Sequence, residues 1–178
     1  IACARFGTVA HEVAGRELPA NTTTPDALEL SRLLRTALDA GQTGAVAEVS
    51  SHALVGRRVD GMRLQVAAWT NLTQDHLDFH STMDEYRDAK LAIFDHVPSD
   101  GRAVLNRDDP YCGDFLDAAR GRVAAEPLTY GVDTAADLRA EHIDATPSGT
   151  TFALSHGDER TRVKLGLLGA YNVYNALA

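Results

Sequence analysis

The sequence predicts an α/β protein, with a mostly parallel β-sheet flanked by helices and a small antiparallel annex toward the C-terminal end. Three segments carry this prediction: "GAVAEVSSHAL" at 44–54, "LQVAAWTNLT" at 64–73 and "RAVLNRDDP" at 102–110. Each begins as a short apolar strand and runs into polar residues. Strands this uniformly apolar are typical of parallel sheets covered on both faces. Polar side chains at the carboxyl ends of such strands are where these sheets bind ligands.

The composition limits the class of protein. A chain of 178 residues with 44% hydrophobic residues most simply forms one domain with a packed core. Its formal net charge of −8 argues against binding nucleic acid regardless of sequence, which requires a basic face. An anionic nucleotide stays compatible, because a few local donors can hold it. Cys3 and Cys112 lack metal-ligand spacing and are expected to be thiols in a reducing compartment. No apolar run approaches the roughly 18 residues needed to span a bilayer.

The first long helix is expected after residue 24, following short β-type stretches in the first twenty residues. Thr24 is a suitable N-cap, Pro25 suits the first helical position, and Asp26 complements the positive end of a helix. Leucine and alanine then recur at helical spacing from Leu30, and Gly41 is a natural stop.

A second helix is expected to begin near Met83, because Thr82 and Glu85 fit a capping box. From about residue 128 the sequence has the pattern of short strands separated by turn residues, which predicts the antiparallel annex. The strand segments are "LTYGV", "LRAEHIDAT", "GTTFALSHG" and "TRVKLGLL". The last ten residues, "GAYNVYNALA", begin another helix.

Lys90 stands where the second helix would bury an apolar residue, since helical steps from Tyr86 reach position 90 before Ile93. The lysine can extend its charged end to water along its methylene groups. It can also pair with Glu48, an isolated carboxylate in an apolar strand. A third alternative is a divalent cation held by Glu48 and His76. Lys90 would then have to become an anion, as carbamylation by CO2 would achieve.

His76 and His80 are four residues apart, a spacing that suits zinc on a helix. However, "DHLDFH" has no glutamate between the histidines, and Asp78 and Ser81 favour a loop. A zinc hydrolase is therefore a remote alternative, and His80 is expected to be a packing histidine.

Five motifs occur in the order found in one enzyme family: "TTTPDALEL", "AEVSSHAL", "TNLTQDHLDFHSTMDEYRDAK", "NRDDPY" and "GAYNVYNALA". Over nearly the whole chain they resemble the central, P-loop NTPase-like domain of the Mur ligases, most closely the MurE type, which acts on UDP-N-acetylmuramoyl-L-alanyl-D-glutamate. The resemblance implies an ATP-dependent, ADP-forming ligase of cytoplasmic peptidoglycan synthesis, and hence of cell-wall growth, cell shape and cell division. Its partners would be UDP-MurNAc-L-Ala-D-Glu, ATP and a diamino acid (meso-diaminopimelate or L-lysine), with no nucleic acid or membrane. ATP would phosphorylate the γ-carboxylate of D-glutamate, and the amine would then displace phosphate.

The resemblance also implies roles for individual residues. Glu48 and His76 match magnesium ligands of the family, and Lys90 matches a lysine that becomes carbamylated and helps to hold a second Mg²⁺. These three residues would form the catalytic and metal site. The matches to contacts with the UDP-muramoyl substrate are Thr23, Thr24, Ser50 and Arg58. Asn172 and Asn175 match residues on the adenine side of ATP, although helix capping stays an alternative for Asn172.

A phosphate loop of the form G-x-x-x-x-G-K-[ST] does not occur in this sequence. In the family the loop lies just upstream of the matched segment, and a C-terminal domain follows. Residues 1–178 are therefore expected to be a partial Mur ligase central domain without these two parts. Such a domain would be inactive alone, because the loop holds the β- and γ-phosphates. Two alternatives stay open: another amide ligase of the superfamily, such as a cyanophycin synthetase or folylpolyglutamate synthase, and a non-catalytic nucleotide-sugar-binding module.

Overall fold

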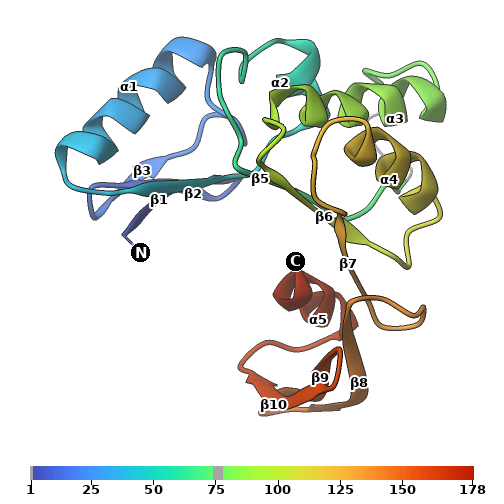
Figure 1. The fold of residues 1–178 in the computed structure, drawn as a ribbon. Helices are drawn as coiled ribbons and strands as arrows, with labels where there is room; N and C mark the ends of the chain where they lie inside the picture. Colours follow the sequence, from blue (N-terminus) through green and yellow to red (C-terminus); the bar gives the residue numbers. More distant parts are fainter. Residues whose placement is uncertain (1, 74–77) are drawn as a thin grey trace. The chain divides into compact units, whose positions relative to one another are not determined.

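The computed structural model describes residues 2–73 and 78–178. The chain forms two compact units (Figure 1). The described part of unit 1 comprises residues 2–62 and 78–96, and that of unit 2 comprises residues 63–73 and 97–178.

Unit 1 contains a four-stranded sheet in the order β3-β2-β1-β4. Its strands are β1 (Cys3–Phe6), β2 (Ala10–Val13), β3 (Arg16–Pro19) and β4 (Gly44–Ala47). The first three strands form an antiparallel meander, whereas β4 runs parallel to β1. Ala14 and Gly15 join β2 to β3 with φ angles of 53° and 72°. Positive φ at both positions is typical of the two-residue hairpin turn whose twist matches the strands.

The apolar strand predicted at the start of residues 44–54 is present as β4, but it ends at Ala47, so Glu48 follows the strand and does not lie inside it. The expectation that the strand is covered on both faces is wrong. Its residues after Gly44 are exposed, and Val46 retains 63% of its accessible surface. The reason is its position at the edge of the sheet, where β1 is its strand neighbour.

Helix α1 (Ala27–Asp39) covers one face of this sheet (Figure 1). Its N-cap is Asp26, whose carboxylate accepts hydrogen bonds from the N–H groups of Leu28 and Glu29. The prediction that Thr24 caps the helix is therefore wrong, because the Thr24 side chain is buried and bonded elsewhere. The predicted stop is confirmed: α1 ends at Asp39, Ala40 is its C-cap, and Gly41 follows with φ of 80°.

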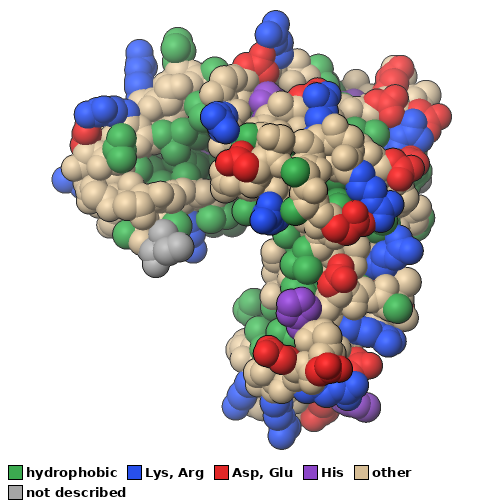
Figure 2. Space-filling view, in the orientation of Figure 1, with side chains coloured by type: hydrophobic (Ala, Val, Ile, Leu, Met, Phe, Trp, Pro, Cys, Tyr) green, Lys and Arg blue, Asp and Glu red, His purple; other side chains and the backbone are tan. Residues whose placement is uncertain are grey.

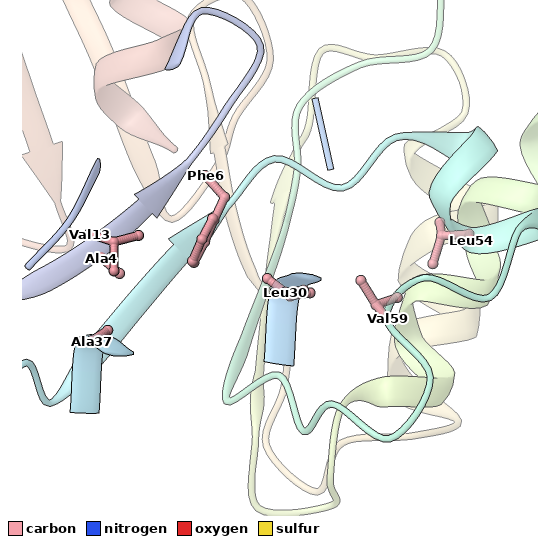
Figure 3. Close-up of a cluster of buried hydrophobic side chains, with 7 residues drawn as sticks. All are labelled: Ala4, Phe6, Val13, Leu30, Ala37, Leu54 and Val59. Atoms are coloured by element: carbon pink, nitrogen blue, oxygen red, sulfur yellow. The ribbon is translucent and has the colours of Figure 1, made fainter. Parts of the chain in front are cut away.

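The core of unit 1 lies between α1 and the sheet (Figure 3). Leu30 and Ala37 of α1 contribute to the same buried cluster as Phe6 of β1. The other members are Ala4, Val13, Leu54 and Val59. Burying these side chains stabilises the unit by roughly 25 cal/mol per Å² of apolar surface removed from water.

Two short helices complete unit 1, α2 (Ser51–Val55) and α3 (Met83–Leu91), and they pack against each other. The capping box is confirmed in its first half, since Thr82 Oγ1 accepts from the Glu85 N–H. The Glu85 carboxylate accepts from the Ser81 N–H rather than from that of Thr82. The helix gives way at Ala92 to a 3₁₀ turn, η1 (Ala92–His96).

Unit 2 contains a six-stranded sheet in the order β10-β9-β8-β7-β6-β5. Its strands are β5 (Val66–Trp69), β6 (Arg102–Asn106), β7 (Leu128–Gly131), β8 (Leu138–Thr146), β9 (Gly149–His156) and β10 (Glu159–Leu165). Strands β5 to β8 are parallel, and β8 to β10 form an antiparallel meander. The expected antiparallel annex is thus confirmed for β8–β10 and wrong for β7. Helix α4 (Cys112–Arg120) returns the chain between β6 and β7, which therefore run in the same direction.

Helices pack on this sheet through large buried side chains. The ring of Phe115 in α4 stacks on Trp69 of β5, with centroids 3.5 Å apart. Val173 and Leu177 of α5 (Ala170–Leu177) join a second buried cluster with Tyr130, Ala140 and Phe152. The predicted helix at the end of the chain is therefore confirmed.

The surface of the β8–β10 meander carries charges of both signs, as Figure 2 shows. Glu141 lies 3.6 Å from Arg139 and 3.8 Å from Arg160. Glu141 is half-buried and both arginines are exposed to water in part, and ion pairs near the surface typically contribute about 0–1 kcal/mol each. Among the helices of the described ranges, none is long and apolar enough to cross a membrane.

Candidate functional site

Glu48 lies at the carboxyl end of β4, beside the carboxyl end of the parallel strand β1. Its N–H donates to Phe6 O, which continues the pairing of the two strands by one step. Because parallel sheets bind ligands at this edge, the first residues after β1 and β4 are well placed for chemistry. The side chain of Glu48 is exposed there.

Thr8, in the loop after β1, holds the Glu48 carboxylate. Its hydroxyl donates to Glu48 Oε2 at 2.9 Å and lies 3.0 Å from the hydroxyl of Thr23. We refer to Thr8, Thr23, Thr24, Glu48 and Ser50 as the Glu48 cluster. Sequence reasoning missed Thr8, because a single threonine in a loop carries no signal of the carboxylate that it will meet 40 positions later.

Thr24 fixes the backbone of the Glu48 cluster. It is fully buried, its hydroxyl donates to Glu48 O at 2.8 Å, and the Ser50 N–H donates to it at 3.2 Å. Arg58 Nη1 and the Thr22 hydroxyl both donate to Thr24 O. The hydroxyl of Thr24 is therefore occupied within the protein, and its described role is to join the segment before α1 to the end of β4.

Ser50 and Arg58 also have structural bonds. Ser50 is the N-cap of α2, and its hydroxyl accepts from the Ala53 N–H at 3.2 Å. Arg58 is half-buried, and its Nη1 donates a hydrogen bond to Thr24 O. The remaining N–H groups of its guanidinium leave it capable of binding an anionic ligand. Arg58 therefore contacts the Glu48 cluster through Thr24, and Ser50 and half-buried Thr23 are members of that cluster.

Lys90 lies in the last turn of α3 and is half-buried. Its Nζ is 5.4 Å from the centroid of the Tyr86 ring, one turn earlier. Tyr86 stacks in turn on His80, whose Nε2 is 2.9 Å from the buried hydroxyl of Ser51. The expectation that His80 is a packing histidine agrees with its 4% exposure.

The alternative of an ion pair between Glu48 and Lys90 is not realised in the described part of the chain, where the Glu48 carboxylate bonds to Thr8 instead. His76, the other expected metal ligand, lies outside the described residues. Within the described ranges, three or more His, Cys, Asp or Glu side chains do not gather into a metal cluster.

The donor set nonetheless suits a hard cation. The Glu48 carboxylate is exposed and accepts a hydrogen bond from the hydroxyl of Thr8, which lies 3.0 Å from the hydroxyl of Thr23. Mg²⁺ prefers oxygen ligands and is commonly held by one or two carboxylates, with water and phosphate oxygens completing the shell. Glu48 alone can supply part of such a shell.

In unit 2 the expected nucleotide-binding residues lie on α5. Asn172 is half-buried and donates from Nδ2 to Leu168 O at 2.8 Å, whereas Asn175 is exposed. The N-cap of α5 is Gly169, so Asn172 does not cap this helix by the usual side-chain bond. The amide of Asn172 instead ties the helix to the loop before it.

The turn after β6 is held by its own side chains. Asp109 is buried and accepts from the N–H groups of Leu72 and Tyr111. Asn106 donates to Thr70 O at 2.7 Å and accepts from the Asp108 N–H. These bonds connect the ends of β5 and β6, the place where a parallel sheet binds ligands.

Comparisons with known proteins identify what the chain is similar to. Residues 2–178 match the family profile of the Mur ligase middle domain. A UDP-N-acetylmuramoyl-L-alanyl-D-glutamate–2,6-diaminopimelate ligase from Bacillus licheniformis is 41% identical, in a match that covers 97% of this chain and 36% of that protein. The ligase of the same name from Geobacillus thermodenitrificans is 42% identical, with the same coverage.

A solved structure of a ligase with this name matches the fold with a TM-score of 0.88 and 32% sequence identity. The match covers 99% of this chain and 36% of that one. The predicted fold class, a mostly parallel sheet flanked by helices with a small antiparallel annex, is thereby confirmed. The chain spans little more than a third of the length of these relatives.

Proposed function

The chain belongs to the family of Mur ligase middle domains, and from this premise we propose that it works within a longer ATP-dependent ligase. That ligase joins 2,6-diaminopimelate to the D-glutamate of UDP-N-acetylmuramoyl-L-alanyl-D-glutamate, in cytoplasmic peptidoglycan synthesis. One observation carries the proposal: relatives of this name are 41% and 42% identical over 97% of the chain. The expectation of a partial central domain belongs to the same proposal, since the chain spans 36% of those relatives.

The reaction is an ADP-forming amide synthesis. ATP phosphorylates the γ-carboxylate of D-glutamate, and the amine of diaminopimelate attacks the resulting acyl phosphate and expels phosphate. The protein contributes mainly by holding the reactants in line and by stabilising charge on the transferring phosphoryl group. Mg²⁺, when bound, neutralises charge between the phosphates and the carboxylate.

In this proposal the Glu48 carboxylate, His76 and a carbamylated Lys90 hold magnesium. Thr8 orients the carboxylate by donating to Oε2, and the other oxygen would be available to the cation. Thr24 holds the main chain of Glu48 in place from its buried position. These bonds keep the metal-binding oxygen in one position before the substrates arrive.

The expected substrate contacts are retained as part of the proposal, with one distinction. Thr23, Ser50 and Arg58 are only partly buried, so their hydroxyl or guanidinium groups are partly accessible to the UDP-muramoyl substrate. Thr24 is fully buried, so it supports these contacts through its neighbours. Asn172 and Asn175 contact the adenine side of ATP.

The sign of the charge on Lys90 supports the proposed carbamylation. Two like unit charges 4 Å apart repel each other by about 4 kcal/mol at an effective dielectric constant of 20. An ammonium group is therefore a poor neighbour for Mg²⁺. The neutral amine can add to CO2 and lose a proton, which gives an anionic carbamate whose oxygens suit the cation.

The activity is tested with the full-length ligase that contains this chain. Release of ADP should require UDP-N-acetylmuramoyl-L-alanyl-D-glutamate and diaminopimelate together, and L-lysine in place of diaminopimelate should support much less turnover. Activity with folates or with an aspartate polymer, but not with the UDP substrate, would instead identify a different ligase of the superfamily. No nucleotide turnover with any acceptor would favour a binding module.

The carbamate is tested separately, and the sequence offers a matched control. Lys90 and Lys164 are the two lysines of this chain, and Lys164 is exposed on β10. Carbon-13 NMR of the ligase in labelled bicarbonate should show a carbamate signal that Lys90→Arg removes and Lys164→Arg retains. A fully active Lys90→Arg variant would contradict the role of the carbamate.

A further inference from the structure

Asp108, in the turn after β6, binds two other segments of unit 2 at once. Its Oδ2 accepts from the N–H groups of Val132 and Asp133, at 2.6 and 3.0 Å, and its Oδ1 accepts from Thr134 at 2.6 Å. The Tyr174 hydroxyl of α5 donates to the same Oδ2 at 2.9 Å. One carboxylate thus connects the end of β6, the loop between β7 and β8, and α5.

The Asp108 carboxylate is ionised and packs closely against Gly131. Burial raises the pKa of Asp108, but its bonds to the N–H groups of Val132, Asp133 and Thr134 outweigh this effect and hold it well below its usual range. A methyl group on Gly131 would lie 3.1 Å from Oδ2, closer than carbon and oxygen normally approach. Glycine at position 131 therefore makes room for the carboxylate.

The Tyr174 hydroxyl is a permanent donor in this arrangement. Burial and the hydrogen bond to the Asp108 anion raise the pKa of Tyr174, so the phenol keeps its proton throughout the physiological range. A donor that approaches a carboxylate makes a stronger bond than one that approaches a neutral oxygen. This contact is therefore a specific anchor for α5.

Helix α5 needs such an anchor if its exposed face is to be held precisely. Val173 and Leu177 fix one side of the helix in the core, through apolar contacts that tolerate small rotations and shifts. A hydrogen bond depends strongly on distance and direction. Tyr174 is next to Val173 on the helix, about 100° further round, so its bond restrains rotation about the helix axis.

We propose that the hydrogen bond between Asp108 and Tyr174 positions the nucleotide-binding face of α5 in the ligase. The inference rests on the proposed function, in which Asn172 and Asn175 of this helix contact ATP. Asp108 and Tyr174 are positioning residues and do not contact the nucleotide themselves. Both carboxylate oxygens of Asp108 already accept bonds from the protein, and its negative charge would repel a phosphate.

The test is Tyr174→Phe in the full-length ligase, which removes one oxygen and keeps the ring. Loss of this bond should raise the Kd for a non-hydrolysable ATP analogue, and the KM for ATP, by roughly three- to tenfold. The kcat and the KM values for the other two substrates should stay within about twofold, since those groups are bound elsewhere. Tyr171→Phe is the control, because it makes the same chemical change on the same helix at a side chain that is 69% exposed.

Two further outcomes decide the inference. If Tyr174→Phe lowers the melting temperature but leaves the Kd for the nucleotide unchanged, the bond is only structural and the proposal is overturned. Asp108→Asn also weakens the bonds to Val132, Asp133 and Thr134, so it should weaken nucleotide binding at least as much as Tyr174→Phe. Adding Tyr174→Phe to Asp108→Asn should weaken binding no further, because the bond between the two side chains is already lost. Additive defects would contradict the coupling. A wild-type ligase that binds no ATP would instead refute the proposed function.

Discussion

Replacing Thr24 by valine should loosen the site without altering its shape. Valine fills nearly the same volume but removes the hydroxyl that donates to Glu48 O and accepts from the Ser50 N–H. A buried polar group that loses its partner costs about 1–3 kcal/mol. Because Thr24 is fully buried and Ser50 is half-buried, we expect a loss of about 2 kcal/mol in the local stability of this segment.

The assay is hydrogen–deuterium exchange of the segment from the end of β4 to α2, which contains the Ser50 amide. A change of about 2 kcal/mol corresponds to roughly 30-fold faster exchange of that amide. The control is Thr22→Val, two residues away. The Thr22 hydroxyl donates to Thr24 O, but it is exposed, and Arg58 donates to the same carbonyl. Loss of the Thr22 hydroxyl should lower the local stability by less than about 0.5 kcal/mol. Equal exchange in the two variants would refute the reasoning that burial makes the Thr24 bonds important.

Three more outcomes follow from described contacts. Asp108→Asn should destabilise unit 2 near neutral pH, and the difference from wild type should shrink as pH falls below about 4. The pKa of Asp108 is lowered in the folded protein, so its stabilising effect is complete above the pKa of the unfolded chain and is lost as pH falls toward the pKa of the folded state. Urea unfolding followed by Trp69 fluorescence measures the difference in unfolding free energy between variant and wild type. A difference that does not change with pH would contradict this reasoning. Phe115→Ala should cost about 3–5 kcal/mol in the same assay, since the fully buried ring stacks on Trp69, whereas half-exposed Leu168→Ala should cost far less. Asp26→Ala should destabilise α1 by about 1 kcal/mol through loss of its N-cap. Circular dichroism during unfolding measures the loss, and an unchanged helix stability would contradict the assignment of Asp26 as the cap.

The sequence by itself determined the local elements and the family. Gly41 at the end of α1 and Thr82 at the start of α3 act through bonds to residues three or four positions away, so the sequence alone predicts these two helix ends. The apolar runs that become β4, β5 and β6 are equally local. The ordered motifs around Glu48 and Lys90 identified the family before any distance was known. His76 stays a prediction, since it lies outside the described residues.

Only the tertiary structure decided which distant groups meet. Thr8 reaches Glu48 because β1 and β4 pair in parallel, and pairing between strands 40 residues apart leaves no periodic trace in the sequence. The sequence predicts Thr24 as the helix cap because threonine suits that position, but in the structure Thr24 is buried and Asp26 is the N-cap. Tyr174 meets Asp108 across 66 positions in the same way. Short-range patterns specify helices and strands, whereas side-chain partnerships between elements depend on how their faces pack, and that packing fixes the geometry of the site.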